Sequence, residues 1–357
     1  MSRPAPLVPS GTHALAGPLS LEPLEDVAAW QAAVDGIEHA TFCHHAGWRE
    51  VMTDALGHEC LYRVARGSDG AVRGVLPLVR MRSRILGQHL VSMPFLNYGG
   101  PVGSPAARRL LAAWALAEAA RLRADSLELR LRAAGEPLPG YAPGRPKVTV
   151  LLDLPPAAES LWNAFPSKLR SQIRRPLREG MQLVIGPGEL GAFHDVFSRN
   201  MRDLGTPVLA RGFFERLLRV FPDEVVFAAV HHRGVPVAAG CGFLWRGEFE
   251  LTWASSLREA NRLAPNMLLY WGLMEWAIGR GARLFNFGRC TPGGGTHRFK
   301  LQWGGRDLEL PWATGAGRGT PGGDGRAARL ATRAWRRLPL PVANRLGPFL
   351  SRRIPTF

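Results

Sequence analysis

The chain has 357 residues, with 45 Lys plus Arg against 29 Asp plus Glu and a formal net charge of +16. Its 46% hydrophobic residues can form a packed core, which excludes a mainly disordered chain, and at about 150 residues per domain the length predicts two domains. The four cysteines, Cys43, Cys60, Cys241 and Cys290, form no Cys-x-x-Cys pair, which argues against a disulfide framework or a zinc ribbon. We therefore expect a reducing, cytoplasmic compartment and no metal site.

Neither end of the sequence predicts export or a membrane span. Prolines and a histidine interrupt Met1 to Ser20, where a secretory signal would need an unbroken apolar run. No uncharged apolar stretch reaches the roughly 18 residues that a membrane-spanning helix requires. The position of the excess charge is informative instead, because a clustered excess indicates an anionic partner whereas a diffuse one only aids solubility.

The first half, residues 19–155, mixes helices and strands. Gly67-Ser-Asp-Gly70 separates two β-rich runs and predicts a hairpin. In chain order we predict a helix at Gly47–Leu56, the hairpin strands Cys60–Arg66 and Gly74–Arg80, a strand at Leu90–Met93, a turn-rich loop at Pro94–Pro101, a helix at Ala106–Arg123, and strands at Ser126–Leu131 and Val148–Leu152.

The second half, residues 156–313, repeats this plan. In chain order we predict a helical arm at Ala157–Gly180, a strand at Met181–Ile185, helices at Glu189–Leu204 and Gly212–Val220, strands at Val225–His231, Val235–Leu244 and Glu248–Ser255, a helix at Pro265–Gly279, a strand at Arg283–Phe287, a loop at Gly288–Gly295, a helix at Thr296–Trp303 and a strand near Leu308. A hairpin followed by strand, helix and strand is typical of GNAT-type acyltransferases. We predict an α/β (α+β) fold with two tandem GNAT-like domains, whose mixed, mostly antiparallel sheets are flanked by helices.

A basic cluster lies on the helical arm. Lys168, Arg170, Arg174, Arg175 and Arg178 fall within eleven residues, and three of them have the i, i+4, i+8 spacing that places them on one helix face. Pro176 is expected to bend or interrupt the helix. Such a face suits phosphate, and the alternative is an ordinary solvated surface.

The segment 314–357 carries half of the charge excess, with nine arginines against the single acid Asp324. It opens with a Gly-rich linker and continues as two stretches with apolar residues at helical spacing, from Ala327 to Leu338 and from Val342 to Leu350. Basic amphipathic segments of this kind bind anionic membrane surfaces. A solvated tail, a tail docked on the protein's own core and nucleic-acid binding are the alternatives.

Three segments resemble the FemAB family: Pro166–Arg175, Ala264–Tyr270 and above all Phe285–Gly304, which reads FNFGRCTPGGGTHRFKLQWG. More narrowly, they resemble the FemAB-like proteins encoded beside exosortase/PEP-CTERM exopolysaccharide loci. The resemblance covers most of the chain. It implies two GNAT-like domains and transfer of an aminoacyl group from aminoacyl-tRNA to a peptidoglycan precursor.

The resemblance also implies a catalytic role for the pair Phe299-Lys300, whose lysine is tied to catalysis in the Fem enzymes. Acyl transfer to an amine needs a donor for the developing oxyanion and a route for the proton, and Lys300 would supply positive charge to the oxyanion or the leaving group. We take Glu250 as the candidate base. Glu248, Glu250 and Thr252 alternate with Phe249, Leu251 and Trp253 along the predicted strand, so one polar face would meet the substrate.

The remaining candidate residues would bind substrate. They are Lys168, Arg170 and Arg174 on the arm, Trp253 on the strand, Asn266 and Tyr270 on the following helix, and Arg289 and His297 in the Gly-rich block. The segment Arg258–Ala264 contains no glycine, unlike the diphosphate-binding loop of acetyl-CoA-dependent relatives, which argues against coenzyme A.

We therefore expect an acyl- or aminoacyltransferase that acts on an amine of a cell-envelope or exopolysaccharide precursor, which is often lipid-linked. The acyl donor, aminoacyl-tRNA or acyl-CoA, would be a co-substrate, with no tightly bound cofactor. The expected location is the cytoplasm, at the inner face of the cytoplasmic membrane. Two alternatives stay open: an N-acyltransferase that uses acyl-CoA, and a non-catalytic scaffold that recruits polysaccharide machinery to the membrane.

Overall fold

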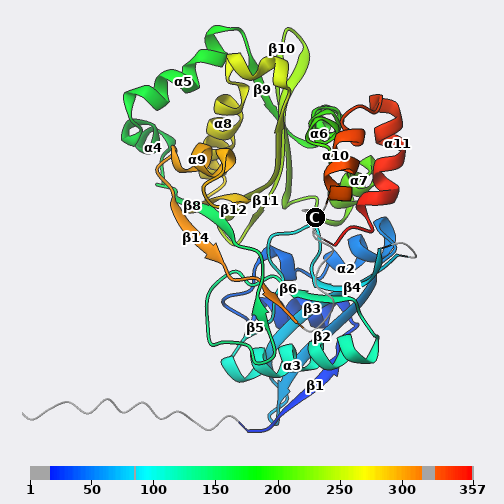
Figure 1. Cartoon of the computed structure of the whole chain (residues 1–357). Coiled ribbons are helices and arrows are strands. Elements are labelled where there is room, and N and C mark those ends of the chain that lie inside the picture. Colours follow the sequence, from blue (N-terminus) through cyan, green and yellow to red (C-terminus); the bar gives the residue numbers. More distant parts are fainter. Residues whose placement is uncertain (1–16, 84–85, 316–325, 356–357) are drawn as a thin grey trace, which may run out of the picture.

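The computed structural model describes residues 17–83, 86–315 and 326–355, which form two β-sheets and the helices that cover them (Figure 1). The first sheet has the order β1 (Leu19–Pro23), β2 (Glu59–Gly67), β3 (Val72–Ser83), β4 (Gly87–Ser92), β6 (Ser126–Leu129), β15 (Ala313–Thr314), β7 (Ala142–Pro143), with β5 (Val102–Gly103) paired to β3. The second has the order β9 (Gln182–Ile185), β10 (Val225–His232), β11 (Val235–Trp245), β12 (Glu248–Ser256), β13 (Leu284–Cys290), β8 (Lys147–Asp153), β14 (Arg306–Leu310).

The two sheets follow one plan, as the repeated element order predicted. In each sheet the described strands form one parallel pair, β4 with β6 and β12 with β13, and the other pairs are antiparallel. A helix makes each parallel crossover: α3 (Pro105–Arg121) and α8 (Pro265–Gly279). Both helices begin with proline, whose missing N–H costs nothing at the first helical position. The mixed, mostly antiparallel sheets are thus confirmed.

Two strands are exchanged between the halves. β8, which we assigned to the first domain, lies in the second sheet between β13 and β14, and β15 from the second half lies beside β6 in the first sheet. The assignment of β8 to the first sheet was therefore wrong. A buried run such as Val148–Leu152 indicates a central strand but carries no information about which sheet it enters.

One hydrophobic core is shared by both halves. Trp30, Trp48 and Tyr62 of the first half pack with Phe221 and Phe243 of the second. Both α1 (Val27–Asp35) and the helical turns α2 (Trp48–Glu50) and η2 (Val51–Ala55) contribute to it. The sequence analysis predicted neither β1 nor α1. A second core lies under α8, and a third joins α3 to the first sheet.

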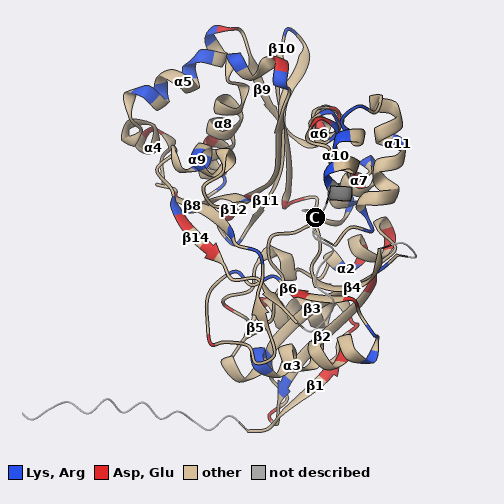
Figure 2. Cartoon of the chain, in the orientation of Figure 1, with Lys and Arg blue, Asp and Glu red and all other residues tan. Residues whose placement is uncertain are grey.

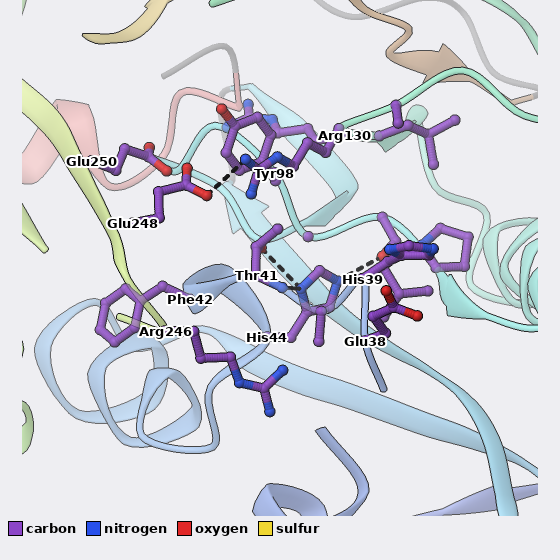
Figure 3. Close-up of a pocket in the computed structure, with 18 of the residues that line it drawn as sticks. Glu38, His39, Thr41, Phe42, His44, Tyr98, Arg130, Arg246, Glu248 and Glu250 are labelled. Carbon is purple, nitrogen blue, oxygen red and sulfur yellow. Dashed lines mark hydrogen bonds and ion pairs between the residues drawn. The ribbon is translucent and has the colours of Figure 1, made fainter. Parts of the chain in front are cut away.

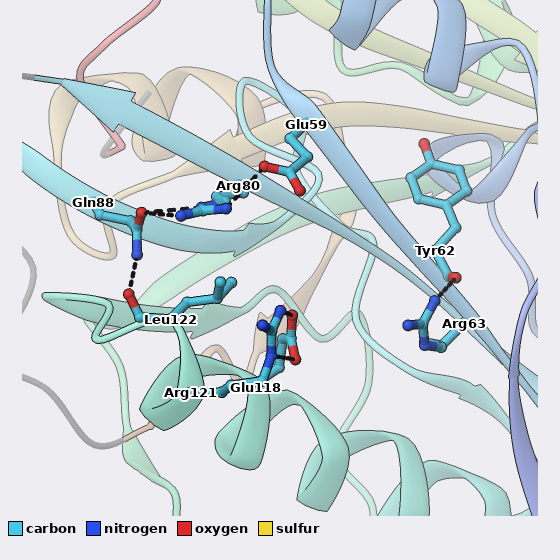
Figure 4. Close-up of polar contacts among 8 residues, drawn as sticks. All are labelled: Glu59, Tyr62, Arg63, Arg80, Gln88, Glu118, Arg121 and Leu122. Atoms are coloured by element: carbon cyan, nitrogen blue, oxygen red, sulfur yellow. Dashed lines mark hydrogen bonds and ion pairs between the residues drawn. The ribbon is translucent and has the colours of Figure 1, made fainter.

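Polar contacts secure the ends of α3 on the first sheet (Figure 4). Gln88 on β4 donates to the carbonyl of Leu122 and accepts from Arg80 on β3, and Arg80 also pairs with Glu59 on β2 at 3.0 Å. Glu118 and Arg121 form an ion pair on the last turns of the helix. The contacts connect strands β2, β3 and β4 with the helix end.

The helical arm is two helices, α4 (Ala158–Ala164) and α5 (Ser167–Arg178), separated at Phe165 and Pro166. Pro176, which we expected to bend or interrupt the arm, lies inside α5 near its end. The break instead coincides with Pro166, whose preceding residue Phe165 has the extended backbone that proline favours. A further pair, α6 (Leu190–Leu204) and α7 (Arg211–Val220), covers the other face of the second sheet (Figure 1).

The chain's last segment docks on the protein itself, which was one of the predicted alternatives. It forms α10 (Arg326–Trp335) and α11 (Leu340–Ser351), and α11 packs against α6. Ala343, Gly347 and Ser351 are its buried residues. The Gly-rich linker that we predicted lies mostly outside the described residues. None of the helices in the described ranges combines the length and the apolar character needed to cross a membrane.

Gly347 allows the closest approach of α11, so we predict that Gly347→Ala destabilises the fold. An added Cβ would lie 2.9 Å from the backbone nitrogen of Val208, closer than real Cβ contacts allow. Urea unfolding should show a free energy of unfolding lower by about 1–3 kcal/mol. Gly212→Ala in α7 is the matched control, because a Cβ there meets nothing within 4 Å. Equal effects of the two substitutions would contradict this packing.

Candidate active site between the two domains

Strands β12 and β13 separate soon after they begin to pair. Their parallel pairing covers Glu248–Glu250 against Leu284–Asn286. Opposite β11, Thr252 is an extra residue in β12, because Cys241 pairs with Trp253 whereas Gly242 pairs with Leu251. The register of β13 against β8 also shifts between Asn286 and Arg289. Both strands thus leave regular pairing at the same level, beside Glu250.

Gly288 permits this geometry. Its φ is +70°, and an added Cβ would lie 2.6 Å from the carbonyl oxygen of Leu251 on β12. A side chain at this position would push the two strands apart, so glycine is required here.

Glu250 is a buried carboxyl at the separation point. Its side chain accepts a hydrogen bond from Asn97 Nδ2 at 2.5 Å and one from Thr252 Oγ1 at 3.4 Å. Burial, together with the neighbouring carboxylate of Glu248, raises the pKa of Glu250 from 4.5 to about 7. A carboxyl with this pKa exchanges its proton at neutral pH, as a general base requires.

Lys300 approaches the same point from helix α9 (Gly295–Leu301). Its ammonium donates to the carbonyl of Gly288 at 2.6 Å and to that of Arg289 at 3.1 Å. Only 4% of the residue is exposed, and burial lowers the pKa of Lys300 to about 8, while the nearby Glu250 opposes that shift. Two of the three N–H donors are used by carbonyls, and the third remains for a ligand.

Asn286 connects the parts of the site. Its Nδ2 donates to Glu248 and to the hydroxyl of Tyr98, each at 2.8 Å. Its Oδ1 accepts from Thr149 on β8 and from the backbone N–H of Gly288. All its hydrogen-bonding positions are used, so Asn286 orients Glu248 and holds the backbone of Gly288, whose carbonyl accepts from Lys300.

The first domain contributes a strained loop to this site. Met93 and Phe95 have positive φ values of 57° and 70°, a conformation that costs about 1–2 kcal/mol per residue. The loop that they begin is buried throughout and carries Asn97 and Tyr98. Sequence analysis missed both as site residues. The signal was the turn-rich run Pro94–Pro101, which we recognised only as a loop.

A cavity of about 540 Å³ lies between the domains at this point (Figure 3). Glu248, Glu250 and Tyr98 are on its wall, and Arg108 and Arg132 also line it. Arg132 pairs with Glu248 at 2.7 Å. No acidic partner holds Arg108 among the residues that the structure describes. The cavity wall thus carries both carboxyl groups and guanidinium groups.

His44 also lines the cavity, but it has a structural role. Its Nδ1 accepts from the backbone N–H of Thr41, so its Nε2 carries the proton and donates to the carbonyl of Gly100 at 2.9 Å. Burial lowers the pKa of His44 to about 4, which keeps it neutral at physiological pH. It fastens the loop after Tyr98 to the segment before α2.

Trp253 lies on a different face from the one we predicted. The extra residue at Thr252 breaks the alternation, so Trp253 packs with Phe213, Phe214 and Phe243 in the shared core. The strict alternation of Glu248, Glu250 and Thr252 with three apolar residues was therefore wrong beyond Leu251.

The other predicted residues of the second domain surround the site without reaching the cavity. Tyr270 stacks on Phe287, and Phe299 packs edge-on against Tyr270 at 5.0 Å. His297 accepts from the N–H of Gly293 and donates to Asp307 at 2.8 Å, so it anchors the Gly-rich loop.

Two further candidates carry buried atoms without a partner. Arg289 stacks on Trp312 at 5.1 Å and leaves its Nη1 unpartnered, and burial with Arg130 alongside lowers the pKa of its guanidinium. Asn266 donates to Ser256, while its Oδ1 is unpartnered.

The basic residues of α5 form a separate group away from the cavity, on a helix that packs against α8 through Leu169, Ile173 and Pro176. Arg174 lies over Trp162 at 5.0 Å, and the buried Nε of Arg170 has no hydrogen-bond partner. None of the five cations of α5 has an acidic partner within the described part of the chain. In Figure 2 they form a basic arm at the edge of the second domain.

Comparison with known proteins supports the fold and the resemblance. A profile described as "Acetyltransferase (GNAT) domain" matches residues 167–301. The UDP-N-acetylmuramoylpentapeptide-lysine N(6)-alanyltransferase of Weissella viridescens is 24% identical over 153 residues, which are 42% of this chain and 45% of that enzyme. The match therefore spans less than half of the curated relative.

Solved structures with the same architecture cover most of the chain. FemX has a TM-score of 0.61 at 14% identity, over 83% of this chain and 96% of FemX. L-PGS from Bacillus licheniformis has a TM-score of 0.55 at 14% identity, over 88% and 98%. A tandem GNAT protein from the clavulanic acid biosynthesis pathway has a TM-score of 0.55 at 16% identity, over 85% and 99%. The predicted fold of two tandem GNAT-like domains is confirmed.

The raised pKa of Glu250 predicts a stability change with pH. The folded protein retains a proton that the unfolded chain releases above pH 4.5, so this contribution is complete below pH 4.5 and is lost as pH rises through about 7. Wild type should lose on the order of 3 kcal/mol of unfolding free energy across this range, and Glu250→Gln should not show that loss in urea unfolding. Glu309→Gln, an exposed carboxyl of β14, should retain the wild-type pH dependence. If Glu250→Gln kept the wild-type pH dependence of the unfolding free energy, the raised pKa would not belong to Glu250.

Proposed function

We propose that the protein is an aminoacyltransferase that acylates an amine of a cell-envelope precursor. The observation that carries this proposal is that Glu250 lies on the cavity wall where β12 and β13 separate, while Lys300, held on the carbonyl of Gly288 in β13 behind that wall, is near enough to feel the charge of Glu250. Burial moves the pKa values of both groups toward neutrality, to about 7 and about 8. Such a pair combines proton transfer with charge stabilisation.

In this mechanism the acceptor amine enters the cavity and attacks the acyl carbonyl. The carboxylate of Glu250 takes a proton from the amine as the N–C bond forms, and the free N–H of Lys300 stabilises the oxyanion. Collapse of the tetrahedral intermediate breaks the bond between the carbonyl carbon and the leaving oxygen, which leaves as a hydroxyl after taking a proton. In this proposal Lys300 supplies that proton, and the proton that Glu250 took from the amine restores Lys300.

For the donor, we propose aminoacyl-tRNA rather than acyl-CoA. The segment where coenzyme A-dependent relatives bind diphosphate is the 3₁₀ helix Arg258–Leu263, which has no glycine. The unpaired cations of α5 offer instead a surface for a phosphate backbone. The Weissella relative is an alanyltransferase, which favours the same donor class. Acyl-CoA remains the second candidate because the GNAT profile matches residues 167–301.

For the acceptor, we propose a peptidoglycan or exopolysaccharide precursor with a free amine, lipid-linked or nucleotide-linked, processed at the inner face of the cytoplasmic membrane. The substrate in the name of the Weissella enzyme, a muramoylpentapeptide with a lysine amine, supports the first class. The resemblance of Phe285–Gly304 to the exosortase-associated proteins supports the second. The cations around the cavity suit the phosphates or carboxylates that either acceptor carries.

The proposed mechanism predicts a bell-shaped pH profile of kcat/KM. Glu250 must be ionised, which produces an acidic limb near pH 7, and Lys300 must be protonated, which produces an alkaline limb near pH 8. Glu250→Gln should lose the acidic limb and Lys300→Met the alkaline one, each with kcat/KM lower by about 10²–10⁴-fold. A profile that keeps both limbs in these variants would overturn the assignment of roles.

The donor can be identified by mass spectrometry of products formed with charged tRNA or with acyl-CoA. We expect product with charged tRNA, at least about tenfold less with Arg170→Ala, and none with Lys300→Ala. Arg219→Ala on α7 is a matched basic control outside α5 and should retain activity. Product with acyl-CoA alone would favour the second donor.

A non-catalytic scaffold makes a different prediction. If neither donor yields product, and if Lys300→Ala and Arg170→Ala restore polysaccharide in a deletion strain as well as wild type, the transferase proposal is wrong.

A further inference from the structure

The outer face of α10 and α11 is the largest gathering of exposed apolar side chains in the described chain. Ten large hydrophobic residues are exposed among the described residues, and four of them, Leu330, Val342, Leu346 and Phe349, lie on these two helices. A fifth, Leu204, lies at the end of α6, where Arg336 of the tail donates to its carbonyl. Isolated exposed hydrophobics are ordinary, but a cluster of this kind marks an interaction surface.

Docking on α6 leaves this face outward. Ala343, Gly347 and Ser351 are buried against the body, and Asn344 donates to Ser198 on α6. Val342, Leu346 and Phe349 have the i, i+4, i+7 spacing of one helix stripe and are 41%, 46% and 52% exposed. The stripe therefore faces away from the protein core.

Arginines surround the stripe, and acids do not. Residues 326–355 contain eight arginines and no Asp or Glu. Arg345 is exposed on α11, and Arg353 stacks on Phe349 with its guanidinium carbon 3.7 Å from the ring centroid. Figure 2 shows blue stretches of ribbon, which mark Lys or Arg, on α10 beside the mostly tan α11. An apolar stripe bordered by arginine matches the boundary between acyl chains and anionic headgroups.

We propose that the outer face of α10 and α11 binds the surface of an anionic lipid membrane. The apolar stripe enters the interface, and the arginines remain at the level of the phosphates, where a long cationic side chain is stable. The face is preformed, because the two helices are folded on α6 rather than ordered by the lipid. This binding does not depend on the proposed reaction.

The surface is connected to the cavity. The chain leaves α11 and places the carbonyl of Pro355 3.0 Å from Nη2 of Arg130, a residue of the cavity wall. The segment that follows α11 thus links the proposed membrane-binding face to the cavity wall. Delivery of a lipid-linked acceptor to the cavity is a consequence that rests on the proposed function.

The test is cosedimentation of the full chain with vesicles. Wild type should pellet with phosphatidylcholine/phosphatidylglycerol vesicles, should not pellet with phosphatidylcholine alone, and should release as salt rises. The double variant Leu346→Ser/Phe349→Ser should bind about 10–100-fold more weakly. The apolar control is the double variant Leu177→Ser/Val235→Ser. These two side chains are 51% and 53% exposed on other parts of the surface, so their replacement should leave vesicle binding unchanged.

Charge is tested separately. Arg333→Gln/Arg345→Gln should weaken binding by about tenfold or more, whereas Arg174→Gln/Arg175→Gln on α5 should leave it near wild type. Equal losses from both pairs would mean that net charge alone attracts the vesicles, and would overturn the proposal.

Two further outcomes would also refute it: wild-type binding by Leu346→Ser/Phe349→Ser, and a wild-type dimer in sedimentation velocity that this variant dissociates. Urea unfolding midpoints check that the variants fold. Amine acylation of a water-soluble acceptor should be unchanged in Leu346→Ser/Phe349→Ser, so failure of vesicle binding and failure of the proposed reaction are distinguishable.

Discussion

The exchange of strands between the two sheets determines the arrangement of the molecule. β8 follows the first half but completes the second sheet beside β13, and β15 follows the second half but lies beside β6 in the first sheet. Each half therefore depends on the other for a strand, and the core shared by Trp48 and Phe243 reinforces the link. Because the two halves have little freedom to move apart, the cavity between them has a defined shape. This rigidity lets Asn97 of one half hold Glu250 of the other at 2.5 Å.

The site concentrates groups that are costly to bury. Glu250 and Lys300 are 8% and 4% exposed, and each is held by hydrogen bonds without an ion-pair partner at short range within the described residues. Desolvation disfavours the charged form of both, which is why their pKa values approach one another. The strained backbone at Met93 and Phe95 adds to the cost. Buried ionisable groups and strained backbone both lower the stability of the fold. They are typical of functional sites, where the surrounding structure holds groups in a reactive state.

Local pattern was sufficient for much of the fold. Alternation and turn residues located the hairpin strands, and proline located the start of α8, because these signals depend on neighbours in sequence. The sheet to which β8 belongs could not be predicted in this way, because an apolar run such as β8 can be buried in the core of either sheet. The prediction of the sheet face on which Trp253 lies also failed, because one extra residue at Thr252 reverses the direction of every later side chain in the strand.

The site was predictable in part for a similar reason. Glu250 and Lys300 lie in segments whose pattern or family resemblance drew attention to them. Asn97 and Tyr98 come from the other domain, more than 150 positions before Glu250 in the chain. Their contribution depends on how the domains pack, and a single sequence shows no such contact. Asn286 was overlooked although it lies inside the Phe285–Gly304 block, because its importance comes from four simultaneous partners rather than from its residue type.

The structure also divides the charge excess into parts with different physical meanings. Arginines near the sheets, such as Arg132 and Arg80, pair with carboxylates and contribute to folding. The cations of α5 have no acidic partner within the described part of the chain, and the α10–α11 segment 326–355 contains arginines but no Asp or Glu, so both surfaces carry a local excess of positive charge. Helix α5 and the pair α10 and α11 lie on opposite sides of the second sheet (Figure 1). A polyanionic donor on α5 and a membrane on α11 would therefore not compete for space. Under the proposed function, the protein would hold a large donor and a membrane-bound acceptor at once. The net charge of the chain does not distinguish donor binding from membrane binding, whereas the positions of the arginines do.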